Sequence, residues 1–341
     1  NQVLVPVLAA RDNTSVELVL ELTKCLMRHH EGIIRVTAIF SLILVALLIP
    51  TSVDTFSMDP QQQRNNRDIF QLQSSRRDLL KSPLAVGGAL IYAKLVSDAV
   101  VKLTQRSDGV YPPEHEHRVE DVLAKALVAS IPSTSNRPLR ILEIGIGTQW
   151  RLNQRGLYHS ALDKLSSKGV SQMELTGVDL SIPSEEKLQD LSNRLNSNNN
   201  QLHVNMNAIQ QSITSKLDFP DGYFDSVVGS LVLCSVDNQD AALQEIKRLV
   251  RPNGGTFGYV EHVAVNPGES KYLEWQQKAL DPLQQAVADN CHLRRFTEDN
   301  IATSFAIESS SNSILFSERF VVKDMWPVSC QCCGVVQRLT A

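Results

Sequence analysis

The chain has 341 residues, of which 43% are hydrophobic and 21% are charged, and its formal net charge is −4. These values are typical of a globular protein and allow one large domain or two small ones. The chain has neither the basic excess that favours nucleic-acid binding nor a long acidic tail. We therefore expect a small-molecule partner and no nucleic acid.

The first hundred residues contain an apolar segment that is typical of a targeting signal. Met27 opens a short basic stretch, MRHHEGIIRV, which leads into the apolar run TAIFSLILVALLIP. The most apolar part of this run is shorter than the roughly 20 residues of a membrane-spanning helix and suits the centre of a signal peptide at 33–53. Because Asn1 opens the printed sequence, Met27 is a candidate for the natural start.

A second segment, 74–97, places Arg76 and Arg77 before an uncharged stretch and resembles a twin-arginine export signal. A Gln/Asn-rich stretch separates the two segments, and Phe56 follows the first apolar run. This series resembles the layered targeting of algae with complex plastids and predicts transport to the thylakoid. Alternatively, one or both segments anchor the protein on the endoplasmic reticulum or on a lipid-associated membrane. Either way, 1–105 is expected to be a targeting or membrane-anchor region and 106–341 the catalytic domain.

Beyond residue 106, helix and strand patterns alternate along the chain. HRVEDVLAKALVASI has the apolar spacing of a helix. Strands are expected at 140–147, 174–180, 224–236 and 256–263, and helices at 117–131 and 237–250. Asp237 is the expected N-cap of the later helix, and Asp281-Pro282 is expected to kink or restart a helix that follows the fourth of these strands. The order predicts an open, mostly parallel α/β sheet.

Several polar residues fall at the carboxyl ends of these strands, where ligands bind in such sheets. They are Glu143, Asp179, Ser230, Glu261 and His262. We expect them to converge on one crevice. The N-terminal helical region around Tyr111 to Leu127 is a candidate lid, and its His115 and His117 are expected to be exposed.

The stretch RILEIGIGTQW indicates which cofactor this crevice holds. A dinucleotide loop requires G-x-G-x-x-G, but Trp150 occupies the last position. The acidic residue expected about 20 positions later is missing, because Asp179 lies 34 positions beyond Gly145. Glu-x-Gly-x-Gly-Thr instead suits S-adenosylmethionine, with Gly145, Gly147 and Thr148 offering bare backbone and a small side chain. Asp179 is expected to accept hydrogen bonds from the ribose hydroxyls.

The later part of the domain resembles a known enzyme class. PDGYFDSVVGSLVLCSVDNQDAALQEIKRLVRPNGGTFGYVEH is similar to the corresponding half of class I methyltransferases. LVLCSV, VEHVA, WQQKALDP and DNCHLRR further resemble the membrane-associated methyltransferase-like family, whose animal members are alkyl-thiol S-methyltransferases. The resemblance covers roughly 110–341. It implies a Rossmann-like, seven-stranded sheet with a reversed last strand, S-adenosylmethionine as cofactor, and cofactor contacts from Ser230 and Leu231.

One departure from the family motif bears on cofactor binding. Gln149 replaces the third glycine, which is tolerated if its backbone keeps a negative φ and its side chain turns outward. Three functions stay open. The first is methyl transfer to a small, apolar acceptor, with a thiol favoured; the second is methylation of a quinone or lipid-like acceptor; the third is a non-catalytic scaffold.

For a thiol acceptor, whose ordinary pKa is about 8.5, one weak base is sufficient, and His262 is the candidate. Glu261 is expected to orient His262 or to contact the cofactor. The alternative for His262 is a purely local role that shapes the pocket. The alternative for Asp179 is helix capping through Ser181.

The six cysteines do not form a disulfide framework. They are Cys25, Cys234, Cys291, Cys330, Cys332 and Cys333. No CxxC pair or histidine cluster completes a metal site in the sequence. We therefore expect no metal, a final strand that contains the last three cysteines, a buried Cys234 within a strand, and a structural Cys291.

Overall fold

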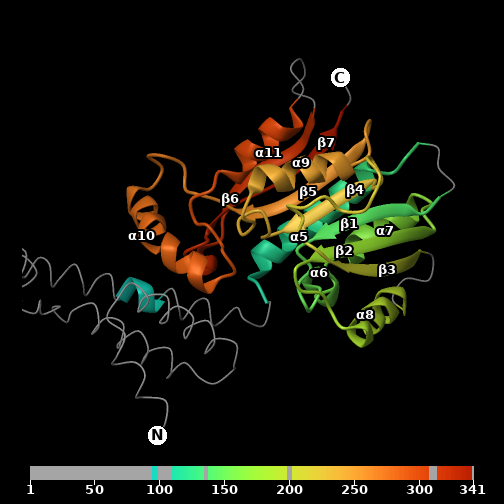
Figure 1. Cartoon of the computed structure of the whole chain (residues 1–341), viewed down its shortest axis with the longest axis horizontal. Coiled ribbons are helices and arrows are strands. Elements are labelled where there is room, and N and C mark those ends of the chain that lie inside the picture. The colour runs from blue at the N-terminus through green and yellow to red at the C-terminus, as the bar shows by residue number, and fades with distance from the viewer. Residues whose placement is uncertain (1–93, 99–109, 134–136, 198–201, 307–312, 340–341) are drawn as a thin grey trace, which may run out of the picture. The chain divides into compact units, whose positions relative to one another are not determined.

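The computed structural model describes residues 94–98, 110–133, 137–197, 202–306 and 313–339 (Figure 1). The chain divides into two compact units, Asn1–Ser107 and Asp108–Ala341. The segments 33–53 and 74–97 lie outside the described residues except for 94–97, which are helical, so the targeting and membrane expectations stay predictions. Within the described part, no helix is both long enough and apolar enough to cross a membrane.

The second unit is built on a seven-stranded sheet with the order β3-β2-β1-β4-β5-β7-β6. The strands are β1 (Leu139–Ile144), β2 (Gln172–Asp179), β3 (His203–Gln210), β4 (Ser226–Ser230), β5 (Gly255–His262), β6 (Ile314–Val321) and β7 (Cys330–Arg338). The first five run parallel to one another, whereas β7 is antiparallel to both β5 and β6. The expected Rossmann-like sheet with a reversed last strand is thus confirmed.

Helices cover both faces of the sheet. They are α5 (Pro113–Ala129), α6 (Arg151–Gln154), α7 (His159–Ser167), α8 (Glu185–Ser197), α9 (Gln239–Leu249) and α11 (Thr297–Phe305), whereas α10 (Lys271–Val287) lies to the left of the sheet in Figure 1. Side chains of α5 to α8 share a core with Ile141 and Val228, and those of α9 and α11 share another with Leu142 and Val227. Because successive strand residues face opposite sides, a near-continuous apolar run is what a sheet covered on both faces requires.

The direction of chain travel reverses between β1 and β4. From β1 the chain proceeds through β2 to β3 on one side, and then returns through β4 to β5 on the other. Ligands of open α/β sheets bind at the carboxyl ends of the strands at such a reversal. We call the carboxyl ends of β1 and β4, with the loops that follow them, the switch point.

Several element boundaries differ from the expectation. The strand expected at 224–236 ends at Ser230, because Leu231 adopts a left-handed backbone with φ of 59°. Cys234 therefore lies in a loop and not in a strand. Helix α9 is capped by Asn238, whose side chain accepts from Ala241 N, so the assignment of the cap to Asp237 was wrong. Helix α10 runs through Pro282 without a break, which corrects the expected restart.

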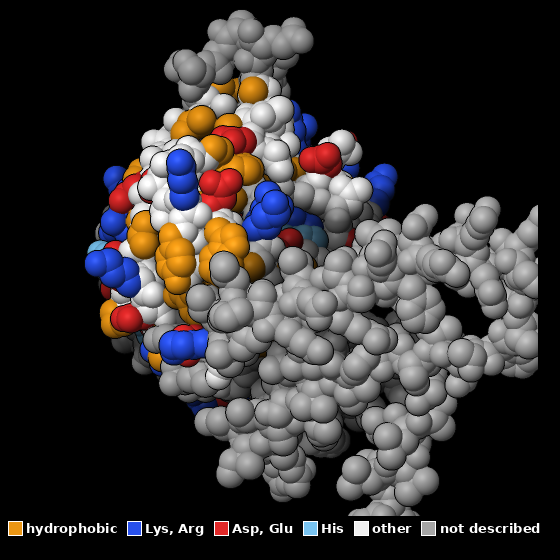
Figure 2. All heavy atoms as spheres, turned by 90° about the vertical axis from the view of Figure 1, so that its left-hand side faces the viewer, with side chains coloured by type: hydrophobic (Ala, Val, Ile, Leu, Met, Phe, Trp, Pro, Cys, Tyr) orange, Lys and Arg blue, Asp and Glu red, His pale blue; other side chains and the backbone are white. Residues whose placement is uncertain are grey.

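The face seen in Figure 2 is the one on the left of Figure 1, where α10 lies. On its described surface, Lys and Arg side chains are interspersed with Asp, Glu and hydrophobic ones. Tyr272 and Trp275 are exposed residues of α10, at 67% and 44%, and their rings stack at 6.1 Å. The described part of this face thus carries positive and negative side chains as well as hydrophobic ones.

Candidate active site

The loop after β1 brings bare backbone to the switch point. Gly145 and Gly147 have φ of 74° and 59°, in the left-handed region that favours glycine. A Cβ added at Gly145 would lie 2.0 Å from Cγ2 of Val232, in the loop after β4. A Cβ at Gly147 would meet nothing within 4 Å. Gly145 is thus required by both space and backbone conformation, and Gly147 by conformation alone.

Asp179 joins the end of β2 to this loop. Its Oδ2 accepts a hydrogen bond from Gly147 N at 2.9 Å, and its Oδ1 accepts one from Ser181 N at 3.0 Å. The hydrogen bond from Ser181 N is the local capping role that the sequence analysis gave as the alternative for Asp179. The side chain is only half-buried, and each carboxylate oxygen can accept more than one hydrogen bond. The cofactor role of Asp179 stays a prediction that this position favours.

Gln149 and Trp150, at the end of the loop, differ in exposure and in backbone conformation. Gln149 is exposed and is not among the residues with positive φ, as its tolerance requires. Trp150 takes the left-handed conformation instead, with φ of 46°, and its side chain is fully buried in the core. A Cβ added at Gly177 of β2 would lie 2.8 Å from Cη2 of Trp150, which shows how closely the indole packs on the sheet.

Glu143 supports the loop from the core side. Its carboxylate is 1% exposed and accepts from Trp150 Nε1 at 2.7 Å and from the Tyr158 hydroxyl at 2.6 Å. Burial raises the pKa of Glu143 to about 7, although both hydrogen bonds oppose this rise. These contacts anchor the loop, and a direct contact between Glu143 and a ligand stays a prediction.

The raised pKa of Glu143 predicts a pH-dependent stability. Between its ordinary value of 4.5 and about 7, the folded chain binds a proton that the unfolded chain does not. The contribution of Glu143 therefore favours the folded state fully below pH 4.5 and is lost as the pH rises through 7. Relative to Glu143→Gln, the wild-type free energy of unfolding should fall by about 3 kcal/mol between pH 4.5 and 7.5. Urea unfolding at several pH values measures this, and parallel profiles would contradict it.

Ser230 and Leu231 close β4 at the switch point. Ser230 Oγ accepts from Arg151 Nη2 at 3.1 Å, and Leu231 N donates to Val260 O at 2.9 Å. Their contacts with a cofactor stay predictions. Thr148, in the loop after β1, is exposed, and its cofactor contact likewise stays a prediction.

Arg151 is a residue of the switch point that the sequence analysis missed. Its Nη1 is buried without a hydrogen-bond partner among the described residues and lies 4.0 Å from Glu116 Oε1. Burial lowers the pKa of this guanidinium. Its position directly after the glycine loop, at the first residue of α6, is the sequence feature that points to it.

Glu261 holds the loop after β4. Its Oε1 accepts from Val232 N at 2.9 Å and from Leu233 N at 3.0 Å, and its Oε2 accepts from Cys234 N at 3.3 Å. Burial raises the pKa of Glu261, and the backbone donors oppose this rise. The carboxylate thus fixes residues 232–234, and the expected roles toward His262 or the cofactor stay predictions.

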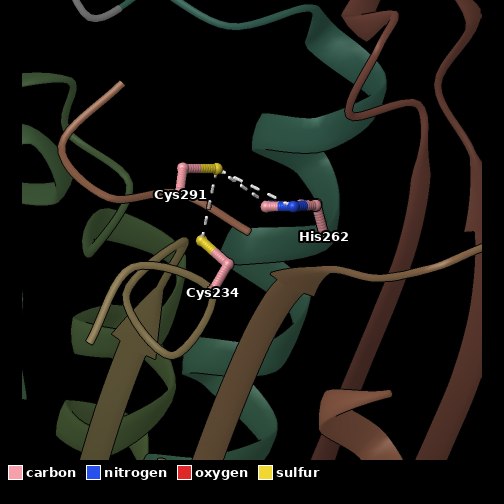
Figure 3. Close-up of side chains that lie close together, drawn as sticks. All are labelled: Cys234, His262 and Cys291. Carbon is pink, nitrogen blue, oxygen red and sulfur yellow. Dashed lines mark hydrogen bonds between the residues drawn. The ribbon is translucent and has the colours of Figure 1, made fainter. Parts of the chain in front are cut away.

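His262 lies in a buried cluster with two cysteines, shown in Figure 3. Its Nε2 is 2.9 Å from His292 O, and both ring nitrogens are 3.7 Å from Cys291 Sγ. Cys291 Sγ is 4.0 Å from Cys234 Sγ. His262 and Cys234 are each 1% exposed, and Cys291 is 7% exposed. The hydrogen bond with Cys234, together with His262, lowers the pKa of Cys291 against the effect of burial. Burial lowers the pKa of His262, but Cys291 and Glu261 outweigh it and the net shift is upward.

The expected exposure of two histidines and the expected place of the last three cysteines have different outcomes. His115 is fully buried, with Nδ1 2.8 Å from Gln331 Oε1, so its expected exposure was wrong, whereas His117 is exposed. The last three cysteines lie in β7, as expected of the final strand. Burial raises the pKa of Cys333 to about 12. Among the described residues, the cysteines that gather with other candidate metal ligands are Cys234 and Cys291, with His262.

Residues 155–257 match the family model described as a methyltransferase domain. The chain is 48% identical over 75 residues to thiol S-methyltransferase TMT1A of Homo sapiens, which is 22% of this chain and 30% of that protein. It is 42% identical over 81 residues to TMT1B of Rattus norvegicus, covering 24% and 32%. It is 33% identical over 86 residues to ubiquinone/menaquinone biosynthesis C-methyltransferase UbiE of Cupriavidus taiwanensis, covering 25% and 35%. The chain spans about a third of the length of these curated relatives.

Proposed function

We propose that this chain is a class I methyltransferase that uses S-adenosylmethionine and that it transfers a methyl group to the sulfur of a small, apolar thiol. The observation that carries the proposal is the 48% identity over 75 residues to a thiol S-methyltransferase. The likeness to the quinone C-methyltransferase is weaker, at 33% over 86 residues. The fold and the residues at the switch point support the same reaction class.

The residues at the switch point fit the chemical groups of S-adenosylmethionine. The cofactor has no phosphate, and the loop after β1 lacks the glycine and lysine of a phosphate-binding loop. Gly145 lets the loop after β1 approach the loop after β4, since a Cβ there would lie 2.0 Å from Val232, whereas a Cβ at Gly147 would meet nothing within 4 Å, which leaves that backbone open to a ligand. Arg151 has a buried Nη1 without a hydrogen-bond partner among the described residues, which suits the carboxylate of the cofactor. Asp179 suits the ribose hydroxyls.

Methyl transfer to a thiol needs little general acid–base catalysis from the protein. When bound, the cofactor supplies a methyl group that a positively charged sulfur already activates. Much of the work of the chain is then to hold the acceptor in line with that methyl group and to exclude water. A thiol with a pKa of about 8.5 is partly ionised near neutral pH, so a nucleophilic thiolate is available. The base role of His262 stays a prediction that the proposal does not need.

A second candidate function is methylation of a quinone-type acceptor at carbon. Its support is the likeness to UbiE, and to a demethylmenaquinone methyltransferase of Streptomyces avermitilis at 35% over 77 residues. The chain covers about a third of each of these two relatives. Carbon is a poorer nucleophile than a thiolate, so this reaction needs a positioned base far more than S-methylation does.

An acceptor assay separates these functions. The purified chain is incubated with S-adenosylmethionine and either an aliphatic thiol or a reduced quinone lacking one ring methyl, and products are identified by mass spectrometry. We expect a methyl thioether from the thiol and no methylated quinone, and Asp179→Ala should form much less thioether when S-adenosylmethionine is limiting. Carbon methylation alone would replace the proposal by the second candidate. A lack of both products together with a lack of cofactor binding would favour a non-catalytic scaffold.

A further inference from the structure

We propose that Cys234, His262 and Cys291 form a binding site for one soft or borderline transition-metal ion, with zinc as the type. Their ligand atoms all lie within 4.8 Å of one another, and all three residues are buried. They come from three segments: the loop after β4, the end of β5, and the turn between α10 and α11. Figure 3 shows the two sulfur atoms and the imidazole turned toward one another.

The spacing of the ligand atoms suits a tetrahedral ion. With Zn–S of about 2.3 Å and Zn–N of about 2.0 Å, ligand atoms on a tetrahedron are about 3.8 Å apart for two sulfurs and about 3.5 Å for sulfur and nitrogen. Cys291 Sγ lies 4.0 Å from Cys234 Sγ and 3.7 Å from Nδ1 of His262. Two of the three edges thus match to within about 0.2 Å of the tetrahedral values.

The hydrogen bond of His262 Nε2 with His292 O leaves Nδ1 as the nitrogen that can bind a metal ion. Its Nε2 is 2.9 Å from His292 O, and because a carbonyl oxygen only accepts, Nε2 carries the proton. In the neutral ring Nδ1 then has a free lone pair, and Nδ1 is 3.7 Å from Cys291 Sγ. Metal-binding histidines almost always donate their other ring N–H to a carbonyl or carboxylate in this way.

Backbone contacts hold the cysteines in place without using their sulfur atoms. His292 N donates to Cys234 O at 2.9 Å, which ties the segment of Cys291 directly to the loop after β4. The carboxylate of Glu261 accepts from three consecutive N–H groups, the last of them Cys234 N at 3.3 Å. Ligands that are fixed before binding lose little conformational freedom when an ion arrives.

The ligand types limit which ion the site takes. Two thiolates and one imidazole favour zinc or copper over magnesium or calcium, which prefer oxygen ligands. Three protein ligands with water in the fourth position make a known zinc arrangement. The ion would link the ends of β4 and β5 to the turn before α11 and so fix the loop beside Ser230.

Metal content and cobalt spectroscopy of the whole purified chain test this site. After incubation with Zn²⁺ and dialysis, the wild-type chain should retain about one ion per chain. Loading with Co²⁺ should give the intense thiolate-to-cobalt charge-transfer absorption. Cys291→Ser and His262→Asn should each lower metal affinity at least about 100-fold, since loss of supporting residues alone costs 10- to 100-fold. The matched control is Cys333→Ser, a buried cysteine of β7 on the α5 side of the sheet, which should bind as the wild type does.

The wild-type measurement is decisive even if a cluster variant fails to fold. A wild-type chain that retains no zinc and shows no charge-transfer absorption with cobalt would overturn the proposal. Equal metal retention by wild type and a folded Cys291→Ser variant, checked by circular dichroism, would overturn it too. These readouts do not involve methyl transfer, so the metal site and the proposed function can fail separately.

Discussion

Replacement of Asp179 by alanine is expected to weaken S-adenosylmethionine binding by about 30-fold or more. A hydrogen bond to a charged group contributes about 1.5–3 kcal/mol, and about 2 kcal/mol corresponds to a 30-fold change in Kd. The substitution also removes the acceptor for Gly147 N, which lies 2.9 Å from Oδ2, and so frees the backbone of the glycine loop. The loss of the ribose acceptor and the release of the glycine loop should both weaken cofactor binding.

Isothermal titration calorimetry of the whole chain measures this effect. Asp179→Asn retains an oxygen that can accept from Gly147 N but loses the charge, so its affinity should lie between those of the wild type and of Asp179→Ala. Glu186→Ala on α8 is the control, because Glu186 is an exposed carboxylate in the helix that follows β2. Its affinity should equal that of the wild type. An unchanged Kd in folded Asp179→Ala would remove the central site assignment.

Trp150→Ala is expected to lower the free energy of unfolding by about 3–5 kcal/mol, the range for truncating a buried tryptophan. The side chain is fully buried and packs against Gly177 of β2. The substitution also removes the donor that Trp150 Nε1 supplies to Glu143 at 2.7 Å. The glycine loop should consequently lose its anchor to the core, and cofactor affinity should fall with stability.

Two further variants separate the causes. Trp150→Phe keeps much of the buried ring and loses the donor, so it should cost about 1–3 kcal/mol from the weaker satisfaction of Glu143. Trp275→Ala on α10 removes a tryptophan that is 44% exposed and should cost less than about 1 kcal/mol. Urea unfolding of the three variants measures these differences. Equal destabilisation by Trp150→Ala and Trp275→Ala would show that the indole of Trp150 does not anchor the loop.

The sequence was sufficient for the sheet because its strands are buried on both faces. Adjacent residues such as Ile141 and Leu142 enter different cores, which produces the continuous apolar runs that predict interior parallel strands. The carboxyl ends of those strands then placed Asp179 and Ser230 on neighbouring parts of one edge, as the structure confirms. The antiparallel direction of β7 is predicted from the family resemblance, because no local sequence pattern indicates it.

Other features depend on contacts between distant segments, which local patterns do not show. The apolar run after β4 predicts a longer strand, but the carboxylate of Glu261 captures three backbone N–H groups and turns the chain after Ser230. Trp150 looks like an obstacle in the motif, whereas the structure buries it beneath the loop. The side chains of Cys234 and Cys291 meet only because the turn before α11 returns to the ends of β4 and β5.

We propose that the switch point binds S-adenosylmethionine and not a nicotinamide dinucleotide. Isothermal titration of the whole chain with S-adenosylmethionine and, separately, with NADPH distinguishes the two ligands. We predict saturable heat with a stoichiometry of about one for S-adenosylmethionine and no binding heat for NADPH. Binding of NADPH without binding of S-adenosylmethionine would contradict the account.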